Sequence, residues 1–298
     1  MQQEKYNAHL AILLANTIFG LGVPVTSYLL SDWTSPMGYM AFRCFGAAAI
    51  FWAISLFLPK EHVERRDLIT ILIGGLLGFV ISQSLTAWAL EYTTPVYFSL
   101  IATLTPVATM LLAALFLGET ITRGKSLGVV IAILGAALLV FAGWTSGTGK
   151  NDPLGITLGI LSLLTWAIYL IITRHVSQKY TAVTQMKWVF LISSIAVLPW
   201  AYNELPVSRL VAEPHASGWM GGVCAMVFIV VFATVLGYFL IPYAMKTLRA
   251  TTVSVYTNLQ PVVASLVAMF IGQDVFTWDK PVAGVLVLLG AWLVTRER

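Results

Sequence analysis

Long runs of apolar residues, separated by short polar or charged stretches, occupy most of this chain of 298 residues. A transmembrane helix needs roughly 20 predominantly apolar residues, whereas a transmembrane β-strand alternates apolar and polar residues over segments of roughly ten. The runs here are continuous, so the pattern predicts an all-α integral membrane protein with ten transmembrane helices. The expected spans are residues 8–30, 35–58, 68–90, 95–117, 126–143, 153–173, 183–202, 218–241, 250–272 and 279–295.

The composition agrees with this pattern. The chain is 58% hydrophobic and 10% charged, whereas about 25% of the residues in a soluble domain are charged. The first span is long, is flanked only by Lys5 and precedes no small-residue cleavage site, so we do not interpret it as a cleaved signal peptide. Cys44 and Cys224 both lie inside apolar spans and form neither a disulfide framework nor a zinc spacing. We therefore expect neither a metal nor a cofactor.

The positively charged residues predict the orientation of the chain. Of the 17 Lys and Arg residues, 12 fall in loops on the side of both termini and 3 in loops on the other side. Arg43 and Lys187 lie within spans, and Lys187 is close enough to a span end to reach the interface. Because cytoplasmic loops carry the excess of Lys and Arg, both termini are predicted to be cytoplasmic. The net charge of +4 then reflects topology and gives no reason to expect nucleic-acid binding.

An internal repeat with an offset of 155 residues relates the two halves. The segment "LTPVATMLLAALFLGE" (104–119) has the counterpart "LQPVVASLVAMFIGQD" (259–274). Further matches at the same offset are Ser99 with Ser254, Pro106 with Pro261, Lys125 with Lys280, and Gly135 with Gly290. The repeats predicted are residues 1–148 and 149–298. Each contains five spans, and because five is odd, the second half is inverted in the membrane relative to the first.

Inverted repeats build many secondary transporters, in which the substrate site lies near the bilayer midplane between the halves. A structural duplication without a transport role is the alternative. The chain contains no HExxH, GxSxG, phosphate-binding loop or paired carboxylates. We therefore expect a transporter that is not an enzyme.

Several segments resemble one family of transporters. They are "NTIFGLGVPVTSYLL" (16–30), "SPMGYMAFR" (35–43), "TLTPVATMLLAALFLGETIT" (103–122), "SLGVVIAILGAALLV" (126–140), "LLTWAIYLIITRHV" (163–176) and "NLQPVVASLVAMFIGQDVF" (258–276). Over residues 10–295 the chain resembles the drug/metabolite transporter superfamily in its ten-helix EamA type. The resemblance implies metabolite transport, often export, through the inner membrane. It leaves the substrate open, and Gly272-Gln273-Asp274 departs from the Leu-Gly-Glu of the first half.

Polar and aromatic residues within the spans are the candidates for the transport path, because polar atoms in the membrane must be paired or face a wet cavity. The substrate-binding candidates are Asn16, Gln83, Trp88, Ser99, Thr103, Trp166, Tyr169, Tyr238, Ser254 and Asn258. Ser99, Thr103 and Pro106 share one helix face, and Ser254, Asn258 and Pro261 share the equivalent face of the other half. Each candidate also fits an ordinary interhelical contact.

Pro106 and Pro261 lie in the middle of their spans and are predicted to be hinges or bends, because proline removes a backbone donor. Arg43 is an intramembrane charge with two interpretations: it serves function, or it pairs with helix-end carbonyls. The spans at 126–143 and 279–295 are almost purely apolar with small residues, which suits packing or a homodimer contact.

The sequence thus predicts a multi-pass protein of the bacterial inner (plasma) membrane that moves a small metabolite by alternating access. An amino acid or a similar amphipathic solute, moved outward, is the favoured cargo. Export of drugs or toxic compounds is the alternative, and a non-transporting membrane protein is the less favoured one. No Asp or Glu lies mid-span, which favours passive or weakly coupled transport and argues against a pump for organic cations.

Overall fold

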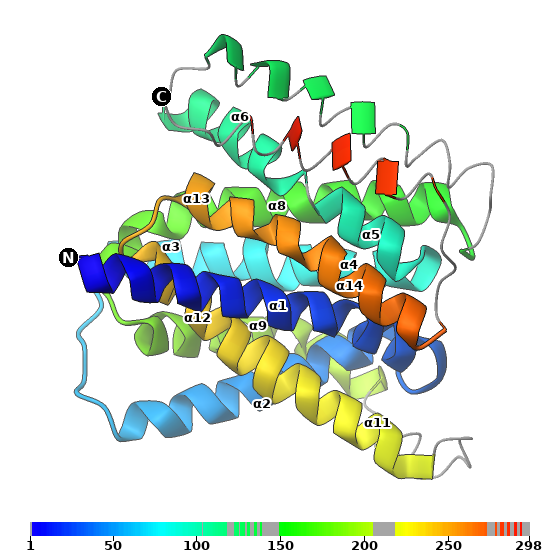
Figure 1. The fold of residues 1–298 in the computed structure, drawn as a ribbon. Coiled ribbons are helices and arrows are strands. Elements are labelled where there is room, and N and C mark those ends of the chain that lie inside the picture. Colours follow the sequence, from blue (N-terminus) through cyan, green and yellow to red (C-terminus); the bar gives the residue numbers. More distant parts are fainter. Residues whose placement is uncertain are drawn as a thin grey trace.

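The computed structural model describes residues 2–102, 104–117, 149–204 and 218–272, with isolated positions in 122–138 and 278–293. This part of the chain is helical and contains no strand (Figure 1). The first half contains α1 (Gln2–Asp32), α2 (Pro36–Leu56), α3 (Arg65–Gly75), η1 (Leu76–Ile81), α4 (Ser82–Tyr92), α5 (Pro95–Ala102) and α6 (Thr105–Leu117). The second contains α8 (Asp152–Lys179), α9 (Ala182–Glu204), α11 (Gly218–Val227), η2 (Phe228–Leu236), α12 (Gly237–Met245), α13 (Ala250–Val255), η3 (Tyr256–Asn258) and α14 (Leu259–Phe270).

Six helical segments of the described residues are long and apolar enough to cross a membrane. They are Gln3–Ser31, Pro36–Leu56, Arg65–Tyr92, Asp152–Lys179, Ala182–Ala201 and Met220–Met245. Thr105–Phe116 is a shorter apolar helix. An all-helical chain with several apolar spans is what the hydrophobic pattern predicted. The count of ten, the inverted repeat and the cytoplasmic termini stay predictions. The spans expected at 126–143 and 279–295, with their dimer contact, fall largely outside the described residues.

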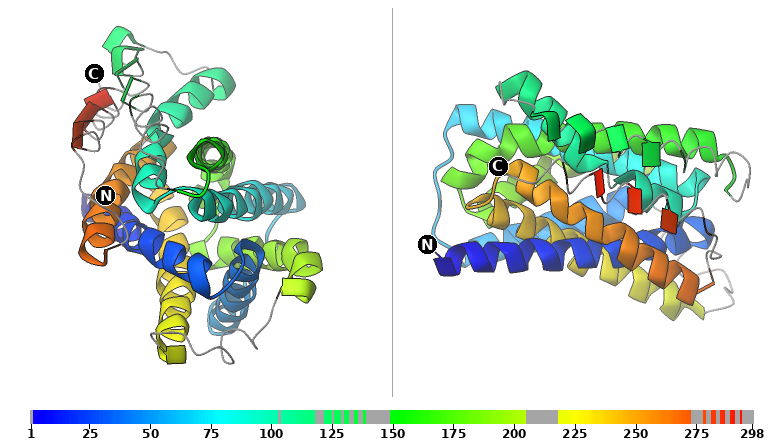
Figure 2. Two further views of the ribbon diagram at one scale, coloured as in Figure 1. Left: turned by 90° about the vertical axis from the view of Figure 1, so that its right-hand side faces the viewer. Right: turned by 45° about the horizontal axis from the view of Figure 1, so that its top comes forward.

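The helices pack in pairs that connect the two halves of the chain. Helix α2 lies against α9, and α1 lies beside α14, as Figures 1 and 2 show. Helix α4 packs on α8 just as α12 packs on α1, and α6 packs on α8 just as α14 packs on α1. The packing is therefore largely unchanged when equivalent helices of the two halves are exchanged.

Close packing of α8 depends on two glycines. Gly74 and Gly78 face Thr173 and Tyr169 so closely that a Cβ on either glycine would overlap these side chains. Small residues four apart let two membrane helices approach each other in this way. The Gly74-x-x-x-Gly78 spacing therefore positions Tyr169, which lies next to the centre of the bundle.

In both halves, the helix is interrupted where the sequence predicted a bend. Helix α5 ends at Ala102 and α6 begins at Thr105, while the short 3₁₀ segment η3 separates α13 from α14. Pro106 is therefore the second residue of α6 and Pro261 the third residue of α14. In the first turn of a helix the missing N–H of proline costs little, because the N–H groups there have no intrahelical partner. Each proline begins a new helix instead of kinking a continuous one.

Threonine hydroxyls satisfy backbone carbonyls at both breaks. Thr105 Oγ1 donates to the carbonyl of Ala102 at 2.6 Å, and Thr257 Oγ1 donates to the carbonyl of Ser254 at 2.6 Å. Pro106 has no N–H to bond the carbonyl four residues earlier, which is that of Ala102. A local hydroxyl thus replaces the missing N–H, which makes the break compatible with a protein interior.

A hydrogen-bonded ionic cluster ties the two halves together at one end of the bundle. Asp67 Oδ2 accepts from Lys179 Nζ at 2.7 Å and from the Tyr180 hydroxyl at 2.8 Å. Lys179 also pairs with Glu64 at 2.7 Å. Asp67 is buried, whereas the Glu64 side chain is 65% exposed. We name Glu64, Asp67, Lys179 and Tyr180 the end cluster.

Replacing Asp67 with Asn is expected to destabilise the protein more than replacing Glu64 with Gln. Asp67 is the buried charged acceptor of two hydrogen bonds, and Asn would turn them into weaker, neutral ones at a cost of about 1–2 kcal/mol, or about 3–6 °C in Tm. Exposed ion pairs contribute little. Thermal unfolding of the purified protein in detergent measures both variants, and equal shifts would contradict the role assigned to burial of Asp67.

Candidate functional site

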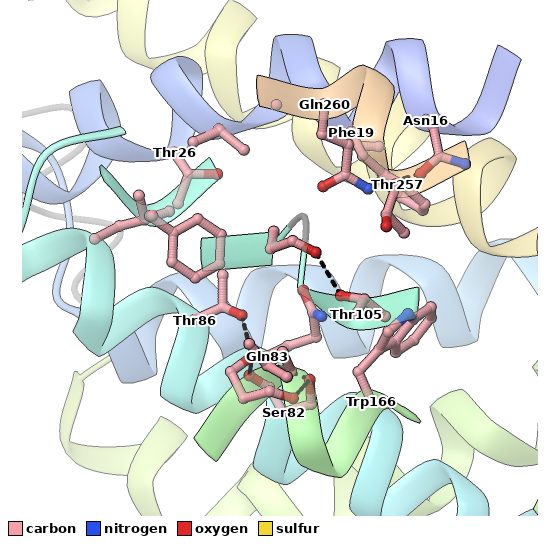
Figure 3. A pocket seen from close by; sticks show the side chains of 18 of the residues that line it. Asn16, Phe19, Thr26, Ser82, Gln83, Thr86, Thr105, Trp166, Thr257 and Gln260 are labelled. Atoms are coloured by element: carbon pink, nitrogen blue, oxygen red, sulfur yellow. Dashed lines mark hydrogen bonds between the residues drawn. The ribbon is translucent and has the colours of Figure 1, made fainter. Parts of the chain in front are cut away.

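A cavity of about 930 Å³, counting the part open to solvent, lies at the centre of the bundle. Side chains from both halves line it, and Figure 3 shows ten of them labelled. The polar and charged lining residues are Asn16, Thr26, Tyr39, Arg43, Ser82, Gln83, Thr86, Thr105, Ser162, Tyr238, Thr257 and Gln260. Apolar lining residues include Phe19, Phe98 and Trp166. The cavity therefore combines hydrogen-bonding groups with aromatic surface.

One side of the cavity carries a pair of amides. Gln260 Nε2 donates to Asn16 Oδ1 at 2.7 Å, and Asn16 Nδ2 donates to the carbonyl of Ile12 at 2.8 Å. These bonds fix the orientation of Asn16 on α1 and connect it to α14, which begins with the break at η3. Figure 3 shows Asn16, Thr257 and Gln260 together on this side.

The opposite side is built on a hydroxyl cluster between α4 and α8. Ser82 Oγ lies 3.0 Å from the carbonyl of Ser162, and Ser162 Oγ lies 2.9 Å from the carbonyl of Ser82. Thr86 Oγ1 is 2.7 Å from Ser162 Oγ. These hydroxyls have local partners, so they hold the two helices together as well as making the cavity surface polar.

Aromatic rings form a connected wall around Tyr238. Its ring centroid lies 4.9 Å from that of Phe79, 5.2 Å from that of Phe19 and 5.8 Å from that of Trp166, each in an edge-to-face arrangement. Rings in this geometry stabilise one another beyond the area they bury. Trp166 in turn packs on Tyr169 at 4.8 Å. The wall presents a rigid apolar surface to the cavity.

Arg43 is a buried cation at the cavity, with 4% of its surface exposed. Its Nε donates to Thr234 Oγ1 at 2.9 Å and its Nη1 donates to Gln83 Oε1 at 3.1 Å. The guanidinium also lies over the rings of Tyr39 and Phe79, both at 5.1 Å to the centroid. In these contacts the hydrogen-bond partners are side-chain oxygens and not helix-end carbonyls.

Two π-helical segments position the groups around Arg43. Segment η1 ends at Ile81, two residues before Gln83. Segment η2 contains Thr234, whose hydroxyl donates to the carbonyl of Ile229, five residues earlier, at 2.8 Å. π-Helical turns are rare and occur frequently at functional sites. The two segments lie in equivalent spans of the two halves. The backbone is therefore irregular close to both hydrogen-bond partners of Arg43.

The cavity brings together only some of the residues that the sequence analysis selected. Asn16, Gln83, Trp166, Tyr238 and Arg43 line it. Tyr169 is buried behind Trp166, and buried Ser254 donates to the carbonyl of Thr251 at 2.8 Å. Asn258 is half-buried, with no hydrogen-bond partner for Oδ1 in the described part. Trp88 is 36% exposed and is not among the described lining residues. Thr103 and the Ser99 side chain lie outside the described residues.

Other lining residues were not selected from the sequence. They are Thr26, Tyr39, Ser82, Thr86, Thr105, Ser162, Thr257 and Gln260. Most have short hydroxyl side chains. In the sequence, these cannot be told apart from serines that hydrogen-bond only to their own helix backbone, such as Ser193. Gln260 could have been selected from the sequence, because a Gln inside an apolar span requires a hydrogen-bond partner or a cavity.

A helical membrane bundle with a polar and aromatic cavity between its halves has the architecture of a small-solute carrier. The model of the EamA-like transporter family matches this chain twice, over residues 7–141 and 153–296. The chain belongs to this family. It is therefore a multi-pass membrane transporter of the drug/metabolite transporter superfamily and, as predicted, not an enzyme.

Relatives and a solved structure agree with this assignment. The chain is 27% identical over 264 residues to the uncharacterized transporter YyaM of Bacillus subtilis, covering 86% of this chain and 83% of that protein. It is 25% identical over 240 residues to a probable terminal-alkyne amino-acid exporter of Streptantibioticus cattleyicolor, covering 80% and 77%. A solved crystal structure with 18% identity covers 98% of this chain and 96% of its own, with a TM-score of 0.66, and so shares the fold.

Adding one methyl group at Gly78 is expected to disturb the wall of the cavity. A Cβ there would overlap the Tyr169 ring, on which Trp166 packs, and overpacking of this kind costs about 1–3 kcal/mol. Gly78→Ala should therefore lower Tm in detergent, whereas Gly124→Ala, with nothing within 4 Å of the added Cβ, should not. Identical Tm values for the two variants would show that α8 moves aside freely.

Proposed function

We propose that this protein exports a small amphipathic metabolite, with an amino acid as the favoured cargo, across the inner membrane of a bacterium. The observation that carries the proposal is the central cavity, which combines fixed amides, an aromatic wall and one buried cation. Such a surface offers separate partners to the polar groups and the apolar side chain of one small solute. The Streptantibioticus relative, a probable terminal-alkyne amino-acid exporter, supports this class of cargo.

The proposed mechanism is alternating access between two inverted five-helix repeats. Three observations support it: the matches at an offset of 155 residues, the packing that persists when equivalent helices are exchanged, and a family match in each half. Repeats of this kind rock around a site at their interface. The excess of Lys and Arg on one side of the membrane supports a cytoplasmic location for both termini.

Two structural elements suit such a movement. The breaks before α6 and α14 separate short helices that can reorient without straining a continuous backbone. The end cluster joins α3 to the end of α8 through Asp67 and Lys179, while Thr93 and Asp152 join the end of α4 to the start of α8 at the opposite end. We propose that the end cluster opens and closes one entrance to the cavity.

Export of drugs or toxic compounds is the alternative function. The edge-to-face ring cluster around Tyr238 favours it, because planar apolar compounds stack on such a wall. Against it stand the polar lining groups and the buried cation, because a purely apolar compound would displace water from them without replacing its hydrogen bonds.

No carboxylate is among the described residues that line the cavity. A proton relay commonly uses an acid or a His inside the membrane. We therefore propose passive or weakly coupled transport.

Transport into and out of proteoliposomes tests the proposed function. Purified protein is reconstituted, loaded with radiolabelled amino acids, nucleosides, sugars or aromatic drugs, and efflux is followed with and without a pH gradient. We expect efflux of amino acids, at a rate that the gradient leaves unchanged. Faster efflux of the drugs would favour the alternative function, and no flux of any compound would contradict the carrier.

Two tryptophans provide a matched test of the path. Trp166 lines the cavity, whereas Trp88 is partly exposed and is not among the described lining residues. Trp166→Ala is expected to reduce efflux by at least about tenfold, since a lost aromatic contact costs roughly 1.5 kcal/mol or more. Trp88→Ala should retain most of the rate at equal reconstituted amounts. The reverse order would move the transport path to the side of α4 that carries Trp88.

A further inference from the structure

Arg43 carries a charge that the described protein groups do not neutralise. Its hydrogen-bond partners, Thr234 and Gln83, are neutral, and so are the three rings that surround the guanidinium. In the part of the chain that the structure describes, no Asp or Glu forms an ion pair with it. A charge inside a membrane protein is costly, and such residues normally pair with an opposite charge or mark a substrate pathway.

The charge is also the only one on the described cavity surface. The other polar lining groups are hydroxyls and amides. Cation–π contacts and neutral hydrogen bonds hold the guanidinium in place, but they leave a positive potential in a space of low polarity. A neutral solute entering the cavity would not relieve that potential, whereas an anionic group would.

We propose that Arg43 binds the carboxylate of the transported solute and so determines the substrate class. This inference deepens the proposed function and rests on it. The guanidinium presents a planar set of donors that matches a carboxylate in a two-pronged pair. Gln83, which already contacts Nη1, is placed to donate its amide N–H to the same carboxylate.

The groups that contact Arg43 come from equivalent positions in the two halves of the chain. Phe79 and Thr234 occupy positions 155 residues apart, and so do Gln83 and Tyr238. All four contact the Arg43 side chain, through the two hydrogen bonds and through rings at 5.1 and 5.7 Å. Two pairs of equivalent positions, one member from each half, therefore meet at one guanidinium. A carboxylate bound there would contact both halves at once.

The rest of the cavity fits the remainder of such a solute. The Trp166 ring offers apolar surface, and the Asn16–Gln260 pair offers an amide oxygen. An α-ammonium group can be satisfied by amide and hydroxyl oxygens without a second protein charge. The proposed substrate is thus a small α-amino acid, or another monocarboxylate with an apolar side chain.

Binding to the purified protein tests this inference independently of transport. Thermal unfolding in detergent is measured with the standard L-amino acids, with the corresponding amino-acid amides, and with chloride and inorganic phosphate. We expect at least one acid to bind about tenfold or more tightly than its amide, since hydrogen bonds to a charged group contribute more than neutral ones. Equal affinities for acid and amide, or equal stabilisation by chloride or phosphate, would overturn the carboxylate assignment.

Charge-changing variants separate recognition from folding. Gln83→Glu places an internal carboxylate within reach of Arg43, so the preference for acid over amide should fall by about tenfold or more while the protein remains folded. Arg43→Lys keeps the charge without the planar fork and should weaken acid binding while amide binding changes less. Gln3→Glu and Arg66→Lys, at exposed positions, are the controls. If Gln83→Glu left the preference unchanged, Arg43 would have only a structural role.

The two proposals fail in different ways. If the reconstituted protein exports acids and amides at equal rates, the transport function is supported and the carboxylate site is contradicted. If acids bind in detergent with the expected preference but no compound crosses the membrane, the carboxylate site is supported and the transport function is contradicted.

Discussion

Hydrocarbon provides no hydrogen bonds, so a chain that crosses a membrane must satisfy every polar group within itself. This constraint determines where the fold departs from regular helix. At the two breaks before Pro106 and Pro261, the hydroxyls of Thr105 and Thr257 bond carbonyls of the preceding turn. At the π-helical segment η2, the Thr234 hydroxyl bonds the carbonyl of Ile229. These irregular positions border the cavity, because only a protein-lined or wet interior tolerates them.

The same constraint explains what the sequence could reveal about the fold. Transmembrane spans can be recognised in the sequence because a membrane helix is predominantly apolar along its whole length. Six such helices are present in the described residues. The family resemblance was confirmed by a match over both halves. Helix interruptions were harder to predict. The prolines marked their place, but whether a proline bends a helix or starts a new one depends on the few residues before it. The π-helical segments left no sequence signal, since Leu76–Ile81 has an ordinary apolar composition.

Individual site residues were predictable according to their size and charge. A large polar side chain such as Asn16 or Gln83, or a charge such as Arg43, cannot be hidden inside a span without a partner or a cavity. Small hydroxyls carry little information, because Ser82 and Ser193 look alike until tertiary structure shows that one bonds a neighbouring helix and the other its own backbone. Trp88 was selected as an aromatic inside a span, yet it is not among the described residues that line the cavity, since helix rotation cannot be read from one residue.

Arg43 has no counterpart in the other half. Arg43 is the eighth residue of α2, and the eighth residue of α9 is the buried apolar Val189. Two identical inverted repeats would give the carrier two conformations of equal energy, related by the symmetry axis. A solute would then meet the same free-energy profile from either side of the membrane. A charge carried by one repeat alone would make the two conformations of the proposed carrier unequal, because the symmetry operation would place it opposite an apolar residue. The membrane potential also acts on this one charge, at about 2.3 kcal/mol per 100 mV for a full crossing. In the proposed mechanism, the duplicated scaffold would supply the movement, and one unduplicated side chain would make its two directions unequal.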